Sequence, residues 1–186
     1  MKVAMLHTRQ VSPEVLYGDQ AVFRLSSADI SVLKDKAKQN PRRRIRVCAH
    51  RGIGDAVHEM FIVHAYDTYI PPHKHLGKSE SFHVIEGTVD VVVFEEDGSV
   101  REVINMGDYL SGHLFYYRIS DPFYHTLIIR SDVLVFHETT SGPFNRADTI
   151  FAPWAPEESN PSGCKAFMRK LLQAADKFLN KEKQRS

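Results

Sequence analysis

The chain has 186 residues, which is enough for one well-buried core but short for two domains. Hydrophobic residues make up 42% and charged residues 25%, so global disorder is excluded. The formal net charge of +1 gives no general attraction to nucleic acid or to an anionic membrane, and neither partner is expected. The first ten residues lack an apolar targeting segment, and Cys48 and Cys164 have the spacing of reduced thiols. A cytoplasmic location is therefore expected.

The first 43 residues carry helix signals and no motif chemistry. Ser12, followed by a proline, is a typical N-cap, so a short helix is predicted to begin there. A second helix is predicted over about residues 28–39, because Ser26 or Ser27 can cap it and lysines lie toward its end. Residues 1–43 are therefore expected to be an N-terminal extension with short helices.

From Arg44 the hydrophobic period changes to two, which is the period of β-strands. Strands are predicted at residues 44–50, 57–64, 81–86, 88–95, 100–105, 114–118, 125–130 and 133–138. Short strands at close and regular intervals predict an all-β barrel or sandwich. We expect this barrel to occupy residues 44–140.

Alternation in the first predicted strand places Arg44, Arg46, Cys48 and His50 on one face. A basic run such as residues 41–44 is most often a solvated strand entrance. If this face instead points into the barrel, Arg46 and Arg44 form a wall that binds phosphate or carboxylate through bidentate hydrogen bonds.

The run from residue 66 to residue 87 contains three side chains that can donate to a metal. His73 and His75 are two residues apart, so an extended backbone places both on one face. Glu80 follows across a turn-prone segment, and Gly87 suits a tight turn between strands. With ten histidines an isolated pair can arise by chance, but the glutamate and glycine at these offsets favour a metal site. Imidazole with carboxylate suits Fe, Mn, Ni, Zn or Cu better than Mg or Ca.

These residues resemble the first signature motif of the cupin superfamily, in which the two histidines and the glutamate are metal ligands. The glycine usual six positions before the first histidine is Asp67 in this chain. Residues 106–109 and 121–126 resemble a stretched second cupin motif, in which a downstream histidine supplies the last ligand. His125 is preferred for that role because it follows a proline-containing turn and opens an apolar strand. His113, in a loop context, competes with it.

Residues 141–186 are expected to be a strap segment followed by a helix. The sequence FAPWAPEE around Trp154 cannot be regular structure, yet its aromatic side chains favour burial. This segment is a packing strap or, alternatively, a wall or lid for a pocket. Ser162 can cap a final helix over about residues 163–180, and its apolar stripe indicates a core or dimer contact.

Four stretches together resemble the WbuC family of cupin-fold metalloproteins. They are HR at residue 50, HEM at residue 58, PPHKH with ESFHVIEG, and GPF with FAPWAPEE, and the resemblance covers roughly residues 10–160. It implies a cupin-type double-stranded β-helix, or jelly-roll, barrel with a metal inside. It also implies an association with O-antigen and other surface-polysaccharide gene clusters, without a defined reaction.

Two functions remain open. The first is a metal-dependent enzyme acting on a sugar or sugar nucleotide, since His73, His75, Glu80 and His125 leave a position open on one divalent ion (Fe, Mn, Zn or Ni). The acid–base candidates are His50, His58 and Glu59. His58 and Glu59 alternate to opposite faces, so at most one of these two lines the pocket. The alternative is a non-catalytic module that binds a carbohydrate or an anion, and a purely structural metal ranks last. A small-molecule ligand and a homodimer are expected.

Overall fold

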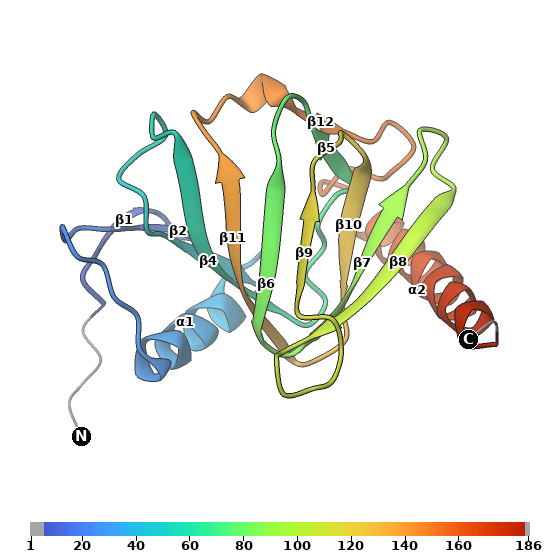
Figure 1. Ribbon diagram of the computed structural model, residues 1–186, viewed down its shortest axis with the longest axis horizontal. Coiled ribbons are helices and arrows are strands. Elements are labelled where there is room, and N and C mark those ends of the chain that lie inside the picture. The colour runs from blue at the N-terminus through green and yellow to red at the C-terminus, as the bar shows by residue number, and fades with distance from the viewer. Residues whose placement is uncertain (1–5, 185–186) are drawn as a thin grey trace.

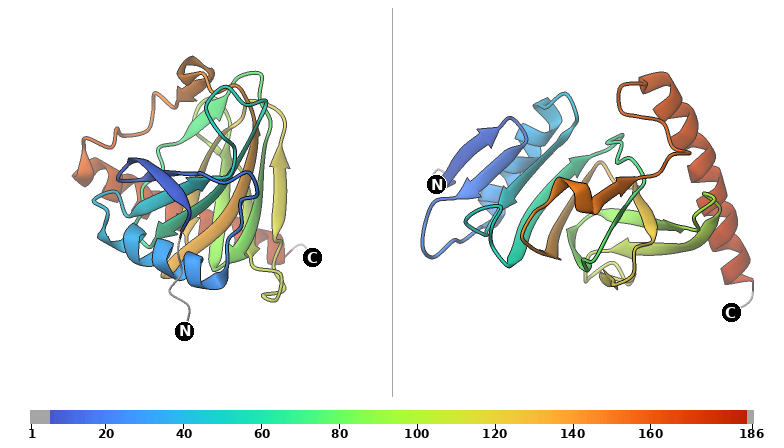
Figure 2. Two further views of the ribbon diagram at one scale, coloured as in Figure 1. Left: turned by 90° about the vertical axis from the view of Figure 1, so that its left-hand side faces the viewer. Right: turned by 90° about the horizontal axis from the view of Figure 1, so that it is seen from above.

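The structure, a computed structural model, describes residues 6–184 and shows two facing β-sheets with a helix on the outer side of each (Figures 1 and 2). The strands are β1 (Thr8–Ser12), β2 (Val15–Gly18), β3 (Arg44–Cys48), β4 (Val57–Ala65), β5 (His73–His75), β6 (Glu80–Glu86), β7 (Thr88–Phe94), β8 (Val100–Gly107), β9 (Tyr116–Ile119), β10 (Tyr124–Ile129), β11 (Val133–Ser141) and β12 (Thr149–Phe151). The helices are α1 (Ser27–Gln39), α2 (Pro161–Lys183) and the 3-10 turn η1 (Arg146–Asp148).

The chain crosses repeatedly between the two sheets. One sheet has the strand order β1-β2-β3-β4-β11-β6-β9, and the other has the order β12-β5-β10-β7-β8. Apart from the parallel pair β2 and β3, the neighbouring strands are antiparallel. This is a jelly-roll arrangement of β-strands in two sheets, so the predicted all-β fold is confirmed. Within residues 6–184 the two sheets are separate hydrogen-bonded ladders rather than one closed barrel.

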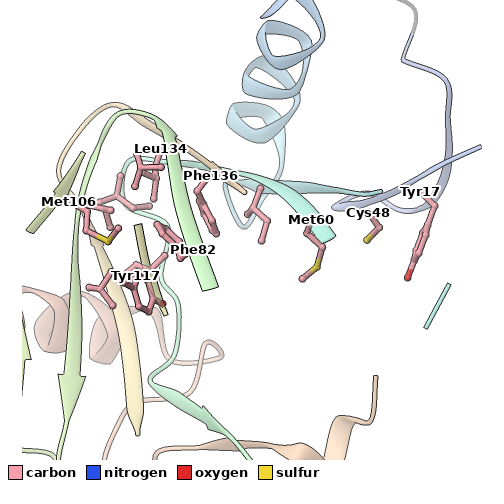
Figure 3. Close-up of a cluster of buried hydrophobic side chains, with 14 residues drawn as sticks. Tyr17, Cys48, Met60, Phe82, Met106, Tyr117, Leu134 and Phe136 are labelled. Atoms are coloured by element: carbon pink, nitrogen blue, oxygen red, sulfur yellow. The ribbon is translucent and has the colours of Figure 1, made fainter. Parts of the chain in front are cut away.

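Apolar side chains from the inner faces of both sheets form the main core (Figure 3). Phe82 stacks on Phe136 with ring centroids 4.0 Å apart, and both side chains are buried. Burying a side chain of this size stabilises the fold by about 1.5–3 kcal/mol. In Figure 3 Met60 and Tyr17 lie away from this aromatic group, and both line a cavity described below.

Helix α1 begins at the predicted position. The Ser26 hydroxyl accepts a hydrogen bond from the Asp29 N–H, and the Asp29 carboxylate accepts one from the Ser26 N–H, which forms a capping box. Leu33 and Ala37 on the inner side of the helix are fully buried against β3, β4 and β11. The helix thus covers part of the outer face of the larger sheet.

The prediction of a helix start at Ser12 is wrong. Residues 8–18 form a hairpin, in which β1 pairs with β2, and β2 continues in parallel to β3. Leu16 and Tyr17 are buried by this pairing, and the Arg46 N–H donates to the Glu14 carbonyl. Burial against a neighbouring strand outweighs the local capping signal, because β-preference is set by packing. The N-terminal extension therefore adds two strands to the sheet.

Helix α2 covers the outer face of the smaller sheet with Leu171 and Ala175, so its apolar stripe is a core contact. Its N-cap is Asn160, two residues before the predicted Ser162, and the Asn160 side chain accepts from the Gly163 N–H. Trp154 of the preceding strap packs between this sheet and the helix. Neither described helix is long and apolar enough to cross a membrane.

Candidate metal centre and ligand cavity

Three histidines from two neighbouring strands converge inside the sandwich. His73 and His75 are the ends of the short strand β5, and His125 of β10 pairs with His73 across the ladder. One ring nitrogen from each lies within 4.8 Å of the other two. The prediction that alternation places His73 and His75 on one face therefore agrees with the structure, which also brings His125 to the same point.

The Nδ1 atom of each imidazole has a hydrogen-bond acceptor. That of His73 lies 2.9 Å from the Pro71 carbonyl, and that of His125 lies 3.1 Å from the Phe123 carbonyl. The Nδ1 atom of His75 lies 3.1 Å from the Thr149 hydroxyl, which β12 brings beside β5. Donation from Nδ1 leaves the lone pair on Nε2, which is how proteins commonly orient histidine ligands.

The Glu80 carboxylate lies at the centre of this group. Its Oε2 is 3.2 Å from Nε2 of His75, and its Oε1 is 3.6 Å from Nε2 of His125. The Tyr117 hydroxyl donates to Oε1 over 3.2 Å. Glu80 is the first residue of β6, so the turn after β5 returns the chain to the histidines, as its sequence suggested.

Burial and close contact set the charges of these groups. Burial lowers the pKa of His73 to about 3, and His125 adds to this effect, so the His73 imidazole is neutral. Burial alone would raise the pKa of Glu80, but its close contacts with His125 and His75 hold it well below its usual value. Burial opposes a charge on His125, yet its contacts with Glu80 outweigh burial and raise its pKa. An ionised carboxylate therefore faces a group of imidazoles.

This donor set fits a divalent transition metal. Three imidazoles with fixed Nδ1 atoms and one buried carboxylate are the ligand types that first-row ions prefer. Within residues 6–184 no other group of three such side chains is this close. The site points to a metal ion, and its ligands suit several members of the series.

His113, the competing candidate, lies elsewhere. It is exposed in the loop between β8 and β9, where its backbone N–H donates a hydrogen bond to the Ser111 hydroxyl.

Two residues of the centre were not recognised from the sequence, namely Tyr117 and Glu138. Burial, and then the charge of Glu80, raise the pKa of Glu138 well above its usual value. Glu138 lies two residues after Phe136, and Tyr117 lies two residues before Ile119, so each shares a strand face with an apolar residue of the core. This spacing is the signal that could have identified them.

A cavity of about 310 Å³ opens beside the histidines. Its lining includes His73, His75 and Glu80 at one end and residues of β3 and β4 along a wall. Register places Arg46 opposite Ile62 and Cys48 opposite Met60, so this face of β3 points inward. The structure therefore resolves the alternative left open by the sequence, and the face with Arg46 is the cavity face.

His50 and His58 form a stacked pair on this wall. Their ring centroids are 4.1 Å apart with an interplanar angle of 15°, and both side chains are buried. Nδ1 of His50 lies 3.1 Å from the Glu59 N–H, whereas Nε2 of His58 has no hydrogen-bond partner among the described residues. The Glu59 side chain is exposed on the outer face beside His137, so of the neighbours His58 and Glu59 it is His58 that lines the cavity.

The two arginines of the predicted wall differ. Arg46 lines the cavity, and its guanidinium forms no ion pair within residues 6–184. Arg44 is paired with Glu14 over 3.1 Å and with Glu158 over 3.4 Å, and it is not among the lining residues. Of the two, only Arg46 lines the cavity, where its charge also acts on the neighbouring Cys48 and Glu138.

The comparisons with known proteins show limited similarity. A family model described as "Domain of unknown function (DUF6016)" matches residues 25–106, which is less than half of the chain. No curated protein matches.

Several solved structures align with part of the chain. Protein SO0799 from Shewanella oneidensis is 10% identical with a TM-score of 0.48, covering 57% of this chain and 72% of that one. Oxalate decarboxylase from Bacillus subtilis, described with Mn(II) centers, is 17% identical with a TM-score of 0.42 over 52% of this chain and 24% of that one. CapF with the inhibitor 3-isopropenyl-tropolone is 18% identical with a TM-score of 0.44 over 53% and 28%. The chain thus spans about a quarter of the length of the last two proteins.

Proposed function

We propose that this protein is a metal-dependent enzyme that acts on a sugar or sugar nucleotide in surface-polysaccharide metabolism. The observation that carries the proposal is that the histidine cluster with Glu80 forms one end of a ligand cavity. A metal held there faces the cavity, whereas a structural site is closed by its own ligands. The sugar and O-antigen part of the proposal is supported by the resemblance of the sequence motifs to the WbuC family.

The side chains around the cavity have complementary roles in this proposal. His73, His75, His125 and Glu80 would hold the ion, which supplies Lewis-acid polarisation of a ligand oxygen. Arg46 binds an anionic group of the ligand through charge-assisted hydrogen bonds. Burial, followed by the neighbouring imidazole of His50, lowers the pKa of His58, so His58 is a neutral base at physiological pH.

The stacked ring of His50 is the second acid–base candidate. In the tautomer in which its Nδ1 accepts from the Glu59 N–H, the ring proton lies on Nε2. Nε2–H of His50 can then donate a hydrogen bond to the ligand, while His58 takes a proton. The pair therefore supplies a hydrogen-bond donor and a base on one wall of the cavity.

Metal content tests the site itself. We expect about one first-row metal ion per chain in purified protein, with loss of the metal in His125→Ala. His113→Ala is the matched control and should keep its metal, because His113 is exposed in a loop. Loss of metal in the control but not in His125→Ala would contradict the assignment.

Turnover separates an enzyme from the alternative, a non-catalytic carbohydrate- or anion-binding module. The metal-loaded protein would be screened with sugars and sugar nucleotides by thermal shift, and every ligand that raises the Tm would be followed by NMR. Conversion that is lost in His58→Gln, with metal content retained, supports catalysis. Binding without any conversion would favour the module.

We also propose that the protein works in the cytoplasm as a homodimer. The support for the dimer is an exposed apolar group beside β9, an edge strand of the larger sheet. It comprises Tyr109, Leu110, Leu114, Phe115 and Tyr116. A patch of this kind beside a free edge suits self-association about a two-fold axis. Light scattering would show a dimer for the wild type and a monomer for Leu110→Ser.

A further inference from the structure

The size of the cavity limits the ligand. Its volume is about 310 Å³. At about 30 Å³ for each molecule of liquid water, such a space holds on the order of ten waters. It is at the small end of ligand pockets, which span about 300–1,000 Å³. A monosaccharide with one acidic group matches this volume, whereas a sugar nucleotide adds a base, a ribose and a diphosphate.

The positive charge on the cavity wall is also limited. Lys78 lines the cavity, but its ammonium group donates to the Pro143 carbonyl over 2.6 Å and lies 3.3 Å from the Asp148 carboxylate. Arg44 is neutralised by Glu14 and Glu158. Arg46 is thus the one lining cation without an ion pair among residues 6–184, which suits one anionic group rather than a diphosphate.

Two imidazoles lie next to this charge. His50 follows Arg46 on the same face of the chain, and His58 stacks on His50. The His58 side chain is only 5% exposed, and its Nε2 has no hydrogen-bond partner in the described part of the chain. A buried polar atom without a partner is costly, so a ligand or a water on this wall is expected to satisfy it.

The mouth of the cavity combines an apolar ring with polar groups. Phe144 lines the cavity although 51% of it is exposed, and Ile53, which also lines it, is 63% exposed. The Phe144 N–H donates to the Ile53 carbonyl over 2.7 Å, which holds the two loops together. Thr140, Ser141 and Asn145 line the same region. A flat apolar ring beside hydroxyl and amide groups suits a polyhydroxylated ring with an apolar C–H face.

We propose that the ligand is a single monosaccharide carrying one anionic group, a carboxylate or a phosphate monoester, which binds Arg46. Its ring lies against Phe144, and its remaining oxygens point toward His73, His75 and Glu80. The placement of the ligand's remaining oxygens near the histidines and Glu80 rests on the proposed function, whereas the binding of the anion to Arg46 does not. A sugar nucleotide would extend beyond this volume of about 310 Å³.

Calorimetric titration of the metal-loaded protein tests the ligand class. The probes are glucose, glucuronate, glucose 1-phosphate and UDP-glucose, repeated in the galacto and manno series to allow for stereochemistry. We expect a sugar acid or sugar phosphate to bind about tenfold or more tightly than the neutral sugar of its series. Comparison of the carboxylate with the phosphate identifies the anion. Tighter binding of the UDP-sugar than of its sugar phosphate would overturn the proposal.

Substitution of the arginine tests its role. Arg46→Gln should abolish the preference for the charged sugar while leaving the weak binding of the neutral sugar and the metal content unchanged. Arg101→Gln is the matched control, because Arg101 pairs with Glu95 outside the cavity. Equal losses for charged and neutral sugars in Arg46→Gln would overturn the proposal.

Titration of the chelated wild type separates this inference from the proposed function. Preference for the charged sugar that persists without metal supports the anion site even if metal analysis contradicts the enzyme. A preference that disappears with the metal would mean that the ion, and not Arg46, binds the anion.

Discussion

Tyr117 donates a hydrogen bond to Glu80 over 3.2 Å, and both side chains are buried inside the sandwich. Burial, and then the charge of Glu80, raise the pKa of Tyr117 well above its usual value, so its hydroxyl remains a donor. Tyr117→Phe should therefore lower metal affinity by roughly 10–100-fold, the scale of other changes to groups that orient metal ligands. Competition with a chelator measures this affinity.

The neighbouring residue gives the control for this prediction. Tyr116 is on the same strand, but its side chain is exposed on the outer face. Tyr116→Phe should bind metal with wild-type affinity. If both variants bind metal as tightly as the wild type, the hydrogen bond to Glu80 does not orient a ligand.

Replacement of Glu80 with Gln separates a functional metal from a structural one. The change keeps the volume of the side chain but removes the negative charge, so metal affinity should fall by at least about 10-fold. The apolar core around Phe82 and Phe136 does not depend on that charge, so the variant should stay folded without metal. Circular dichroism melts of both proteins, with and without chelator, measure this. Unfolding of the chelated proteins would show that binding energy is folding energy.

The stability of the protein should fall in mild acid because of His64. Burial lowers the pKa of this imidazole from 6.5 to about 3 in the folded state. The unfolded chain therefore takes up a proton that the folded chain does not, and stability is lost as the pH falls from about 6.5 toward 3. At pH 5 the loss from this group is about 2 kcal/mol relative to pH 8, from 1.4 kcal/mol for each unit.

Chemical denaturation at pH 8 and pH 5 checks this dependence. His64→Leu should lose about 2 kcal/mol less than the wild type between the two values, since it has no group to titrate. Ile62→Val, two residues away on the same strand face, controls for disruption of the core. It should cost about 0.5–1.5 kcal/mol equally at both values. Identical pH dependence in wild type and His64→Leu would exclude the imidazole as the cause.

The capping box of α1 should contribute to the stability of the whole domain. Ser26→Ala removes the acceptor for the Asp29 N–H and should lower the free energy of unfolding by about 0.5–2 kcal/mol. Ser31 is the control, because its hydroxyl bonds only the Ser27 carbonyl within the same helix. Ser31→Ala should change stability by less than about 0.5 kcal/mol. An unchanged stability in Ser26→Ala would mean that packing of Leu33 alone fixes the helix.

Much of the sandwich could be predicted from the sequence, because its strands alternate with a period of two between glycine-containing turns. The strands from β3 to β11 lie close to the predicted ranges, except for the three-residue β5, which was not predicted as a strand, and α1 begins where Ser26 predicts. The hairpin of β1 and β2 could not be predicted, because it depends on pairing between Leu16 and Val47. That contact joins residues far apart in the chain, whereas the capping signal at Ser12 is local.

The site was predicted unevenly for the same reason. His73, His75 and Glu80 are close in sequence, so spacing alone could propose them as a group. His125 required analogy with a known motif, and Tyr117 required knowledge of the pairing between β6 and β9. The difference between Arg44 and Arg46 was also invisible, because the partner Glu158 lies beyond the last strand.

The bond between His75 and Thr149 spans 74 residues of sequence. A ribosome completes β5 and most of the sandwich before it makes β12, so the His75 ring has no fixed orientation during most of synthesis. Correct metal loading should therefore be a late event, after the strap has added its strand to the sheet. Mutations that slow docking of the strap would then increase the time during which a wrong ion can be captured.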